Sequence, residues 1–190
     1  MSLALQHTEA RPLLFLGFGG VLHPSPCERE RYLEKAPLFE AWLRSQPAVD
    51  VVITSGWRRS HSLARLAAKF SEDLRARFIG TTPDDVPLGQ PIGRPSPCAR
   101  AQLAITADEQ TFIDRHGYRP GERELEIWMW RCRYGMADRP WRVLDDCEWL
   151  FHAQCKELIL VHWETGITPD TLALLDEWLD ACKHETGALS

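Results

Sequence analysis

The chain has 190 residues, of which 44% are hydrophobic and 26% charged, and its formal net charge is −5. These values are typical of one soluble globular domain that buries a substantial core. The acidic balance does not support binding to nucleic acid through bulk charge. No apolar run is long enough to cross a membrane, and the first residues lack the pattern of a signal peptide. We therefore expect a cytoplasmic protein whose six cysteines are reduced thiols.

Taken in chain order, the pattern of apolar residues predicts strands that alternate with helices. The first half is expected to hold a flexible tail, a strand, a loop, a helix, a strand, a helix and a strand, at residues 1–10, 12–18, 25–35, 37–45, 50–54, 59–70 and 77–80. The second half is expected to hold an irregular insertion with a helix or two near 99–113, then a helix, two strands and a helix, at residues 84–120, 122–134, 142–144, 157–162 and 169–182. This order predicts an α/β fold as a single domain over 1–190, with a central parallel sheet of about five strands covered by helices on both faces.

A glycine-rich turn, Gly17–Gly20, follows the first predicted strand. Ligands of open parallel sheets bind beyond the carboxyl ends of the strands, so this turn lies where a site is expected. A dinucleotide-binding loop needs GxGxxG followed by a helix. Its last glycine would fall on Leu22, and Pro24 and Pro26 prevent a helix from following directly. The sequence therefore disfavours a dinucleotide site.

The stretch LLFLGFGGVLHP resembles the first motif of the haloacid-dehalogenase-like (HAD) phosphatase superfamily, an apolar strand followed by Asp-x-Asp-Gly-x-Leu. Both aspartate positions are glycine here, at Gly17 and Gly19. The resemblance implies that the first position would carry the nucleophile, which is also a magnesium ligand, and the second the general acid/base. Glycine can perform neither task, so covalent phosphatase chemistry is not expected from this sequence.

The second predicted strand ends in VVITSGWRR, which resembles the second motif of the superfamily. The resemblance implies that a hydroxyl group at this strand end donates to a phosphoryl oxygen. Either Thr54 or Ser55 can supply it, and the related pattern Ser-Ser-x-Trp-Arg favours Ser55. The alternative is a hydroxyl that caps a turn. Arg58 and Arg59 are expected to be solvated charges, although they could add positive potential to the site.

Two later segments complete the resemblance. VLDD resembles the fourth motif and implies a magnesium site at Asp145 and Asp146, weak or vestigial without the first-motif aspartate. The alternative is an N-cap followed by an acidic residue in the first turn of a helix.

RELEIWMW resembles the R-x-x-E-I segment of small bacterial HAD domains related to those in multidomain RNA-repair proteins, and implies that Arg123 offsets phosphate charge. Its alternative is an exposed arginine. The resemblance covers residues 12–180 and implies a three-layer Rossmann-like HAD fold with a small or absent cap.

Three hypotheses about function follow. The chain is an inactive or impaired relative of HAD phosphatases that binds a phosphorylated small molecule, a nucleotide or a protein. It is, alternatively, a magnesium-dependent phosphohydrolase with an unrecognised nucleophile, acting on a nucleotide, a nucleic-acid end or a small phosphoester. The third hypothesis is an interaction domain with a vestigial pocket. The sequence leaves open the oligomeric state and whether Gly17 and Gly19 are natural or introduced.

Overall fold

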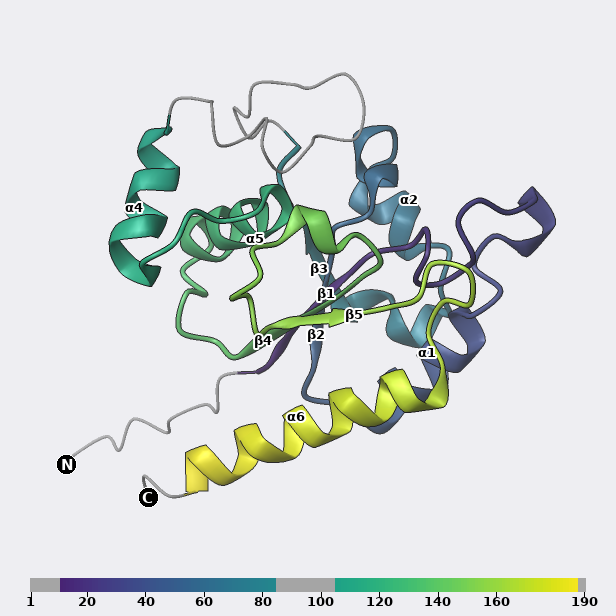
Figure 1. The fold of residues 1–190 in the computed structure, drawn as a ribbon. Coiled ribbons are helices and arrows are strands. Elements are labelled where there is room, and N and C mark those ends of the chain that lie inside the picture. The colour runs from purple at the N-terminus through teal and green to yellow at the C-terminus, as the bar shows by residue number, and fades with distance from the viewer. Residues whose placement is uncertain (1–10, 85–104, 188–190) are drawn as a thin grey trace.

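Five parallel strands form one sheet in the order β3-β2-β1-β4-β5 (Figure 1), in a computed structural model that describes residues 11–84 and 105–187. The strands are β1 (Leu13–Leu16), β2 (Asp50–Ile53), β3 (Phe78–Thr81), β4 (Trp141–Asp145) and β5 (Leu158–Leu160). The central strand β1 pairs with β2 and β4, placing Leu16 beside Ile53 and Leu144. The predicted parallel sheet of about five strands is confirmed. All strands therefore end at the same edge.

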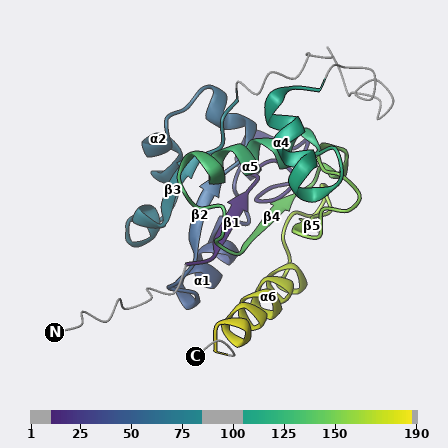
Figure 2. The same ribbon diagram turned by 90° about the vertical axis from the view of Figure 1, so that its left-hand side faces the viewer.

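Alternate residues of each strand point to opposite faces of the sheet and build two cores. Leu14 and Leu16 belong to a large core with α1 (Ala36–Ser45), α2 (Leu63–Ala67) and α6 (Pro169–Gly187). The other face carries Leu13 and Phe15, which pack with residues of α5 (Glu122–Arg133) in a second core. Figures 1 and 2 show α1 and α6 on one side of the sheet and α5 on the other. The fold is thus a three-layer α/β sandwich.

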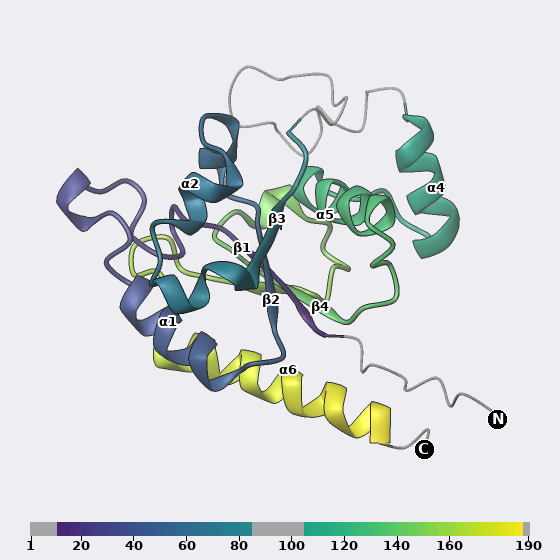
Figure 3. The same cartoon turned by 180° about the vertical axis from the view of Figure 1, so that it is seen from behind.

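The helices α1 and α6, which lie on the same side of the sheet, are joined by a hydrogen bond. The indole N–H of Trp42 on α1 donates to Asp176 Oδ1 on α6 at 2.8 Å, and Figure 3 shows the two helices close together on that side. On the opposite side, α4 (Ala107–His116) packs on the outer surface of α5, with Phe112 against Trp128. Among the described residues, no helix is both long and apolar enough to span a bilayer.

One segment differs from the sequence predictions, and another holds a helix in the part of the chain where one was expected. Residues 59–70 do not form one helix: a 3-10 turn, η2 (Gly56–Arg59), precedes the short α2, because Ser62 interrupts the run and caps α2 by accepting from the Arg65 amide. Within the predicted insertion at 84–120, a helix or two were expected near 99–113, and α4 overlaps this range, beginning at a capping box formed by Thr106 and Glu109. Residues 85–104 and the predicted tail at 1–10 lie outside the described residues.

Three further 3-10 turns lie in the described connections. They are η1 (Arg29–Arg31), η3 (Glu72–Arg77) and η4 (Glu148–Leu150). The turn η1 sits in the exposed connection from β1 to α1, which extends away from the sheet in Figure 1. This connection contains no other helix or strand, so it carries no cap of domain size.

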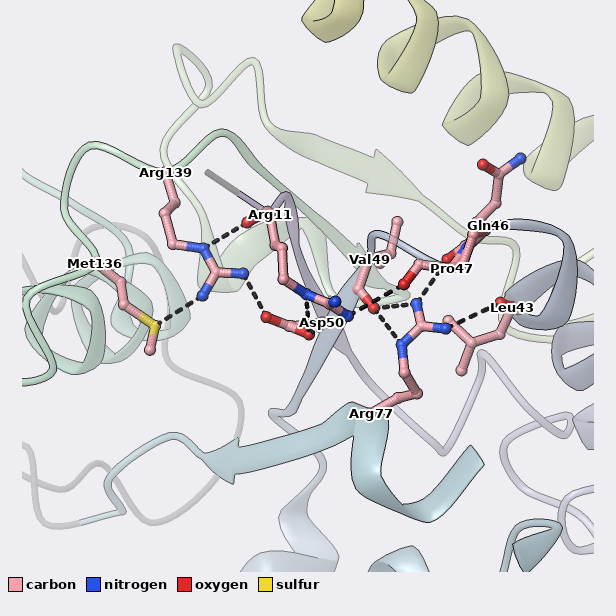
Figure 4. Close-up of polar contacts among 9 residues, drawn as sticks. All are labelled: Arg11, Leu43, Gln46, Pro47, Val49, Asp50, Arg77, Met136 and Arg139. Carbon is pink, nitrogen blue, oxygen red and sulfur yellow. Dashed lines mark hydrogen bonds and ion pairs between the residues drawn. The ribbon is translucent and has the colours of Figure 1, made fainter. Parts of the chain in front are cut away.

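Charged side chains tie the opposite, N-terminal edge of the sheet together (Figure 4). Asp50, the first residue of β2, accepts from Arg11 Nε at 2.9 Å and from Arg139 Nη2 at 2.6 Å. Arg77, just before β3, donates to the carbonyl oxygens of Val49 at 2.7 Å and Gln46 at 2.6 Å. These contacts join the segments that precede β1, β2, β3 and β4, and so fix the starts of the strands.

Candidate functional site

A cavity of about 250 Å³ lies at the C-terminal edge of the sheet. It is lined by every residue that the sequence singled out as a site candidate, namely Gly17, Gly19, Thr54, Ser55, Arg123, Asp145 and Asp146. These residues come from the ends of β1, β2 and β4 and from the first turn of α5. The parallel sheet brings them together because its strands end at one edge.

The turn after β1 offers two positions without side chains. A Cβ at Gly17 would lie 3.1 Å from the Leu144 carbonyl oxygen and 3.8 Å from Asp145 Oδ2, while one at Gly19 would meet only Ser25, at 3.6 Å. Gly20 differs, because its φ is +68° and a Cβ there would lie 2.2 Å from Asp146 Cγ. The turn therefore requires glycine at Gly20, whereas Gly19 has ordinary room for a side chain and Gly17 has room after a small shift.

The two hydroxyl groups after β2 have different surroundings. Ser55 Oγ accepts from the Trp57 amide at 3.3 Å and caps the turn η2. The side chain of Thr54 is completely buried, and its Oγ1 has no hydrogen-bond partner in the described part of the chain. A buried hydroxyl without a partner costs free energy, so Thr54 is the group with unused bonding capacity here.

Arg123 lies on the first turn of α5, with a side chain only 14% exposed. Its Nε is 3.5 Å from Glu126 Oε2 and 3.8 Å from Asp145 Oδ2, and neither Nε nor Nη1 makes a hydrogen bond to a described residue. The alternative of an exposed arginine is wrong. Charge-assisted N–H groups of this kind are suited to bind an anion.

Arg58 was expected to be solvated, and this prediction is wrong. Its side chain is 2% exposed, and Nη2 donates to Glu126 Oε1 at 2.7 Å. Nε also donates to the carbonyl oxygen of Thr82 at 3.1 Å, and Nη1 to that of Thr54. Sequence reasoning missed Glu126 as a site residue, because its partner is distant in the chain.

Asp145 and Asp146 occupy the end of β4. Asp145 Oδ1 accepts from the Cys147 amide at 3.0 Å, and burial raises the pKa of the Asp145 carboxyl group, opposed by Arg123. The Cys147 thiol donates to Asp146 at 3.4 Å, and burial with the neighbouring carboxylates raises the pKa of that thiol. Ligand atoms of these three residues lie within 4.8 Å of one another.

This donor set fits magnesium poorly. Magnesium prefers an octahedron of oxygen ligands, and a thiol is a soft ligand. No carboxylate stands at Gly17, the position that would face Asp145. The guanidinium of Arg123, 3.8 Å from Asp145 Oδ2, also competes with a cation for that oxygen. The described residues therefore provide two carboxylates but not a complete set, and we derive no chemistry from a bound metal.

Aromatic residues form one wall beside the cavity. Trp57 lines it and contacts the rings of Phe18, His23 and Tyr32, with centroids 5.6, 5.8 and 5.4 Å away. His23 is 4% exposed with an unpartnered Nδ1 among the described residues, and burial lowers its pKa. Sequence reasoning did not assign Trp57 to the site; the position just after a strand end was the available signal.

Comparison with known proteins identifies the family of the chain. The family described as "HAD domain in Swiss Army Knife RNA repair proteins" matches residues 13–172, which include β1 to β5 and every lining residue of the cavity. No curated protein and no solved structure matches the chain significantly. HAD proteins generally use magnesium. Because the match covers most of the sequence, the chain belongs to the family of HAD domains found in Swiss Army Knife RNA repair proteins.

Proposed function

We propose that this protein binds a phosphorylated ligand in the cavity at the C-terminal edge of the sheet and does not carry out covalent phosphatase chemistry. One combination of features supports the proposal. Gly17 and Gly19 offer no side chain, while Thr54 Oγ1 and two nitrogens of Arg123 are buried in the same region and make no hydrogen bond to a described residue. Groups that donate to a phosphoryl oxygen are retained, and the groups that would attack and protonate are missing.

A substitute nucleophile is not favoured. Among the cavity-lining groups, the Cys147 thiol is hydrogen-bonded to a carboxylate, as an activated nucleophile would be. Its pKa is raised by burial and by the carboxylates of Asp145 and Asp146, so the reactive thiolate is disfavoured. Ser55 accepts a hydrogen bond from the Trp57 amide, with no base among the described residues bonded to its hydroxyl group.

The ligand class that we propose is a phosphomonoester, such as a nucleotide or the phosphorylated end of a nucleic acid. The description of the family, which places its HAD domains in RNA repair proteins, supports this choice. The net charge of −5 gives no general attraction to nucleic acid. Recognition would therefore depend on local donors, chiefly Arg123, and on contact with the aromatic wall at Trp57.

The test compares the parent chain with a Gly17→Asp/Gly19→Asp variant, using a generic phosphate ester and magnesium. Both glycines have negative φ or extended backbone, and a Cβ at Gly17 would lie 3.8 Å from Asp145 Oδ2. We expect hydrolysis only by the double variant, with Gly17→Asp alone slower by about 10²–10⁴ because it lacks the general acid/base. A Gly56→Asp variant, at a position with no atoms within 4 Å of a Cβ, controls for an added carboxylate.

Hydrolysis by the parent chain would overturn the proposal. A Cys147→Ser variant would then show whether the thiol is the nucleophile. Inactivity of both chains, without any gain in thermal stability from phosphate, would favour the alternative of a protein-interaction domain. If the double variant is inactive and the parent binds phosphate, the proposed ligand binding is supported. Catalysis would then require changes at further positions besides Gly17 and Gly19.

A further inference from the structure

Arg58 lies next to the candidate site but does not line its cavity. The guanidinium group donates to carbonyl oxygens just after β2 and β3, those of Thr54, Thr82 and Pro83. It also donates to the Glu126 carboxylate. Its side chain is 2% exposed, and that of Glu126 is 3% exposed. Arg58 is not among the residues that line the cavity.

Glu126 stands between two arginines and pairs with them unequally. Glu126 Oε1 accepts from Arg58 Nη2 at 2.7 Å, a short charge-assisted hydrogen bond. Its other oxygen, Oε2, is 3.5 Å from Arg123 Nε and has no hydrogen-bond partner within the described residues. Burial raises the pKa of Glu126, and both arginines oppose this effect. The carboxylate is therefore committed to Arg58 and only loosely associated with Arg123.

This asymmetry matters because a buried arginine beside a free carboxylate normally forms a close, two-pronged ion pair. Such a pair would occupy the N–H groups with which Arg123 can bind an anion. Here Nε and Nη1 of Arg123 make no hydrogen bond to a described residue, while the neighbouring acid is held by another cation.

We infer that Arg58 is a positioning residue, which holds the Glu126 carboxylate away from Arg123 and so keeps the Arg123 guanidinium available to a phosphoryl group. This inference rests on the proposed function for the identity of the ligand. It assigns opposite effects to the two members of one buried ion pair: Arg58 supports phosphate binding, and Glu126 competes with it.

The experiment titrates inorganic phosphate into the full chain and its variants by calorimetry. Glu126→Gln keeps the shape and a hydrogen-bond acceptor for Arg58 but removes the competing charge, and we expect phosphate to bind about tenfold more tightly. Arg58→Met frees Glu126 to pair with Arg123, and we expect binding about tenfold weaker. In the Arg58→Met/Glu126→Gln double variant, affinity should return at least to that of the parent.

A Glu122→Gln variant provides the matched control. Glu122 lies on the same helical turn and makes no hydrogen bond or ion pair to a described residue, so its loss reports the general effect of one fewer negative charge. Equal affinities of Glu126→Gln and Glu122→Gln would overturn the inference, as would a double variant as weak as Arg58→Met alone. If Arg58→Met does not fold, the comparison of Glu126→Gln with Glu122→Gln decides.

The two proposals fail in different ways. If the parent binds no phosphate, the proposed function fails, and a measurement without ligand decides the inference. The Nε–H signal of Arg123 in an NMR spectrum should shift and exchange more slowly with water in Arg58→Met than in the parent, because the released Glu126 carboxylate, 3.5 Å away in the parent, then accepts from that N–H. An unchanged Arg123 signal would contradict the inference.

Discussion

The two edges of the parallel sheet differ in how completely the polar groups highlighted there are hydrogen-bonded. At the N-terminal edge, both oxygens of Asp50 accept from arginines, and Arg77 bonds to backbone carbonyl groups (Figure 4). At the C-terminal edge, Thr54 and Arg123 have buried donors without hydrogen-bond partners in the described ranges. Satisfied polar groups stabilise a fold, and unsatisfied ones cost free energy unless a ligand completes them. We therefore attribute a stabilising role to the N-terminal edge and ligand binding to the C-terminal edge.

The largest expected effect belongs to the N-terminal edge. Asp50→Ala leaves Arg139, 16% exposed, without its carboxylate partner, and should lower the free energy of unfolding by about 3 kcal/mol. Urea unfolding measures this loss. An Asp73→Ala variant is the control, because Asp73 pairs with Arg44 at an exposed site and its loss should lower the free energy of unfolding far less than the loss of Asp50. Equal losses in both variants would remove the special role of this edge.

At the C-terminal edge, we expect a substitution that raises the free energy of unfolding instead of lowering it. Thr54→Val replaces the buried, unpartnered hydroxyl by a methyl group, and should raise the free energy of unfolding by about 1 kcal/mol. The same variant should bind phosphate about tenfold more weakly, because one donor to the phosphoryl group is lost. Urea unfolding and calorimetry on one preparation check both effects. A destabilised variant with unchanged phosphate affinity would refute this view of Thr54.

The smallest effect depends on pH. Burial lowers the pKa of His23 in the folded state, so the unfolded chain binds its proton first as the pH falls. Stability is therefore lost from about pH 6.5 down to the folded pKa, by at most about 1.4 kcal/mol per pH unit. We expect the parent to lose more stability between pH 7.5 and 5.5 than His23→Gln does, as measured by urea unfolding. Equal losses would show that His23 does not titrate differently on folding.

The sequence predicted much of the fold because the strands are short apolar runs that end in glycine or polar residues. The prediction of strand ends also brought Gly17, Thr54 and Asp145 to one cavity, since parallel strands end together. The prediction of one helix at residues 59–70 was wrong for a local reason. The apolar residues keep helical spacing on both sides of Ser62, but Ser62 caps α2, and this capping depends on backbone geometry that the spacing does not show.

The ion pairs could not be predicted in the same way. Arg58 and Glu126 are 68 positions apart, and Asp50 and Arg139 are 89 apart, so no local pattern joins them. The preference for Ser55 over Thr54 also rested on a motif alone. Ser55 caps a turn and Thr54 is left unpartnered, and this difference depends on the orientation of two adjacent side chains.

The most direct test of the account is the interaction of the parent chain with a phosphomonoester, followed by calorimetry for binding and by ³¹P NMR for turnover. An Arg123→Met variant is measured beside it, because Arg123 lines the cavity and two of its nitrogens make no hydrogen bond to a described residue. The account predicts saturable binding by the parent, loss of that binding in Arg123→Met, and no release of inorganic phosphate by either chain. Absence of binding by the parent, or turnover of the ester, would contradict it.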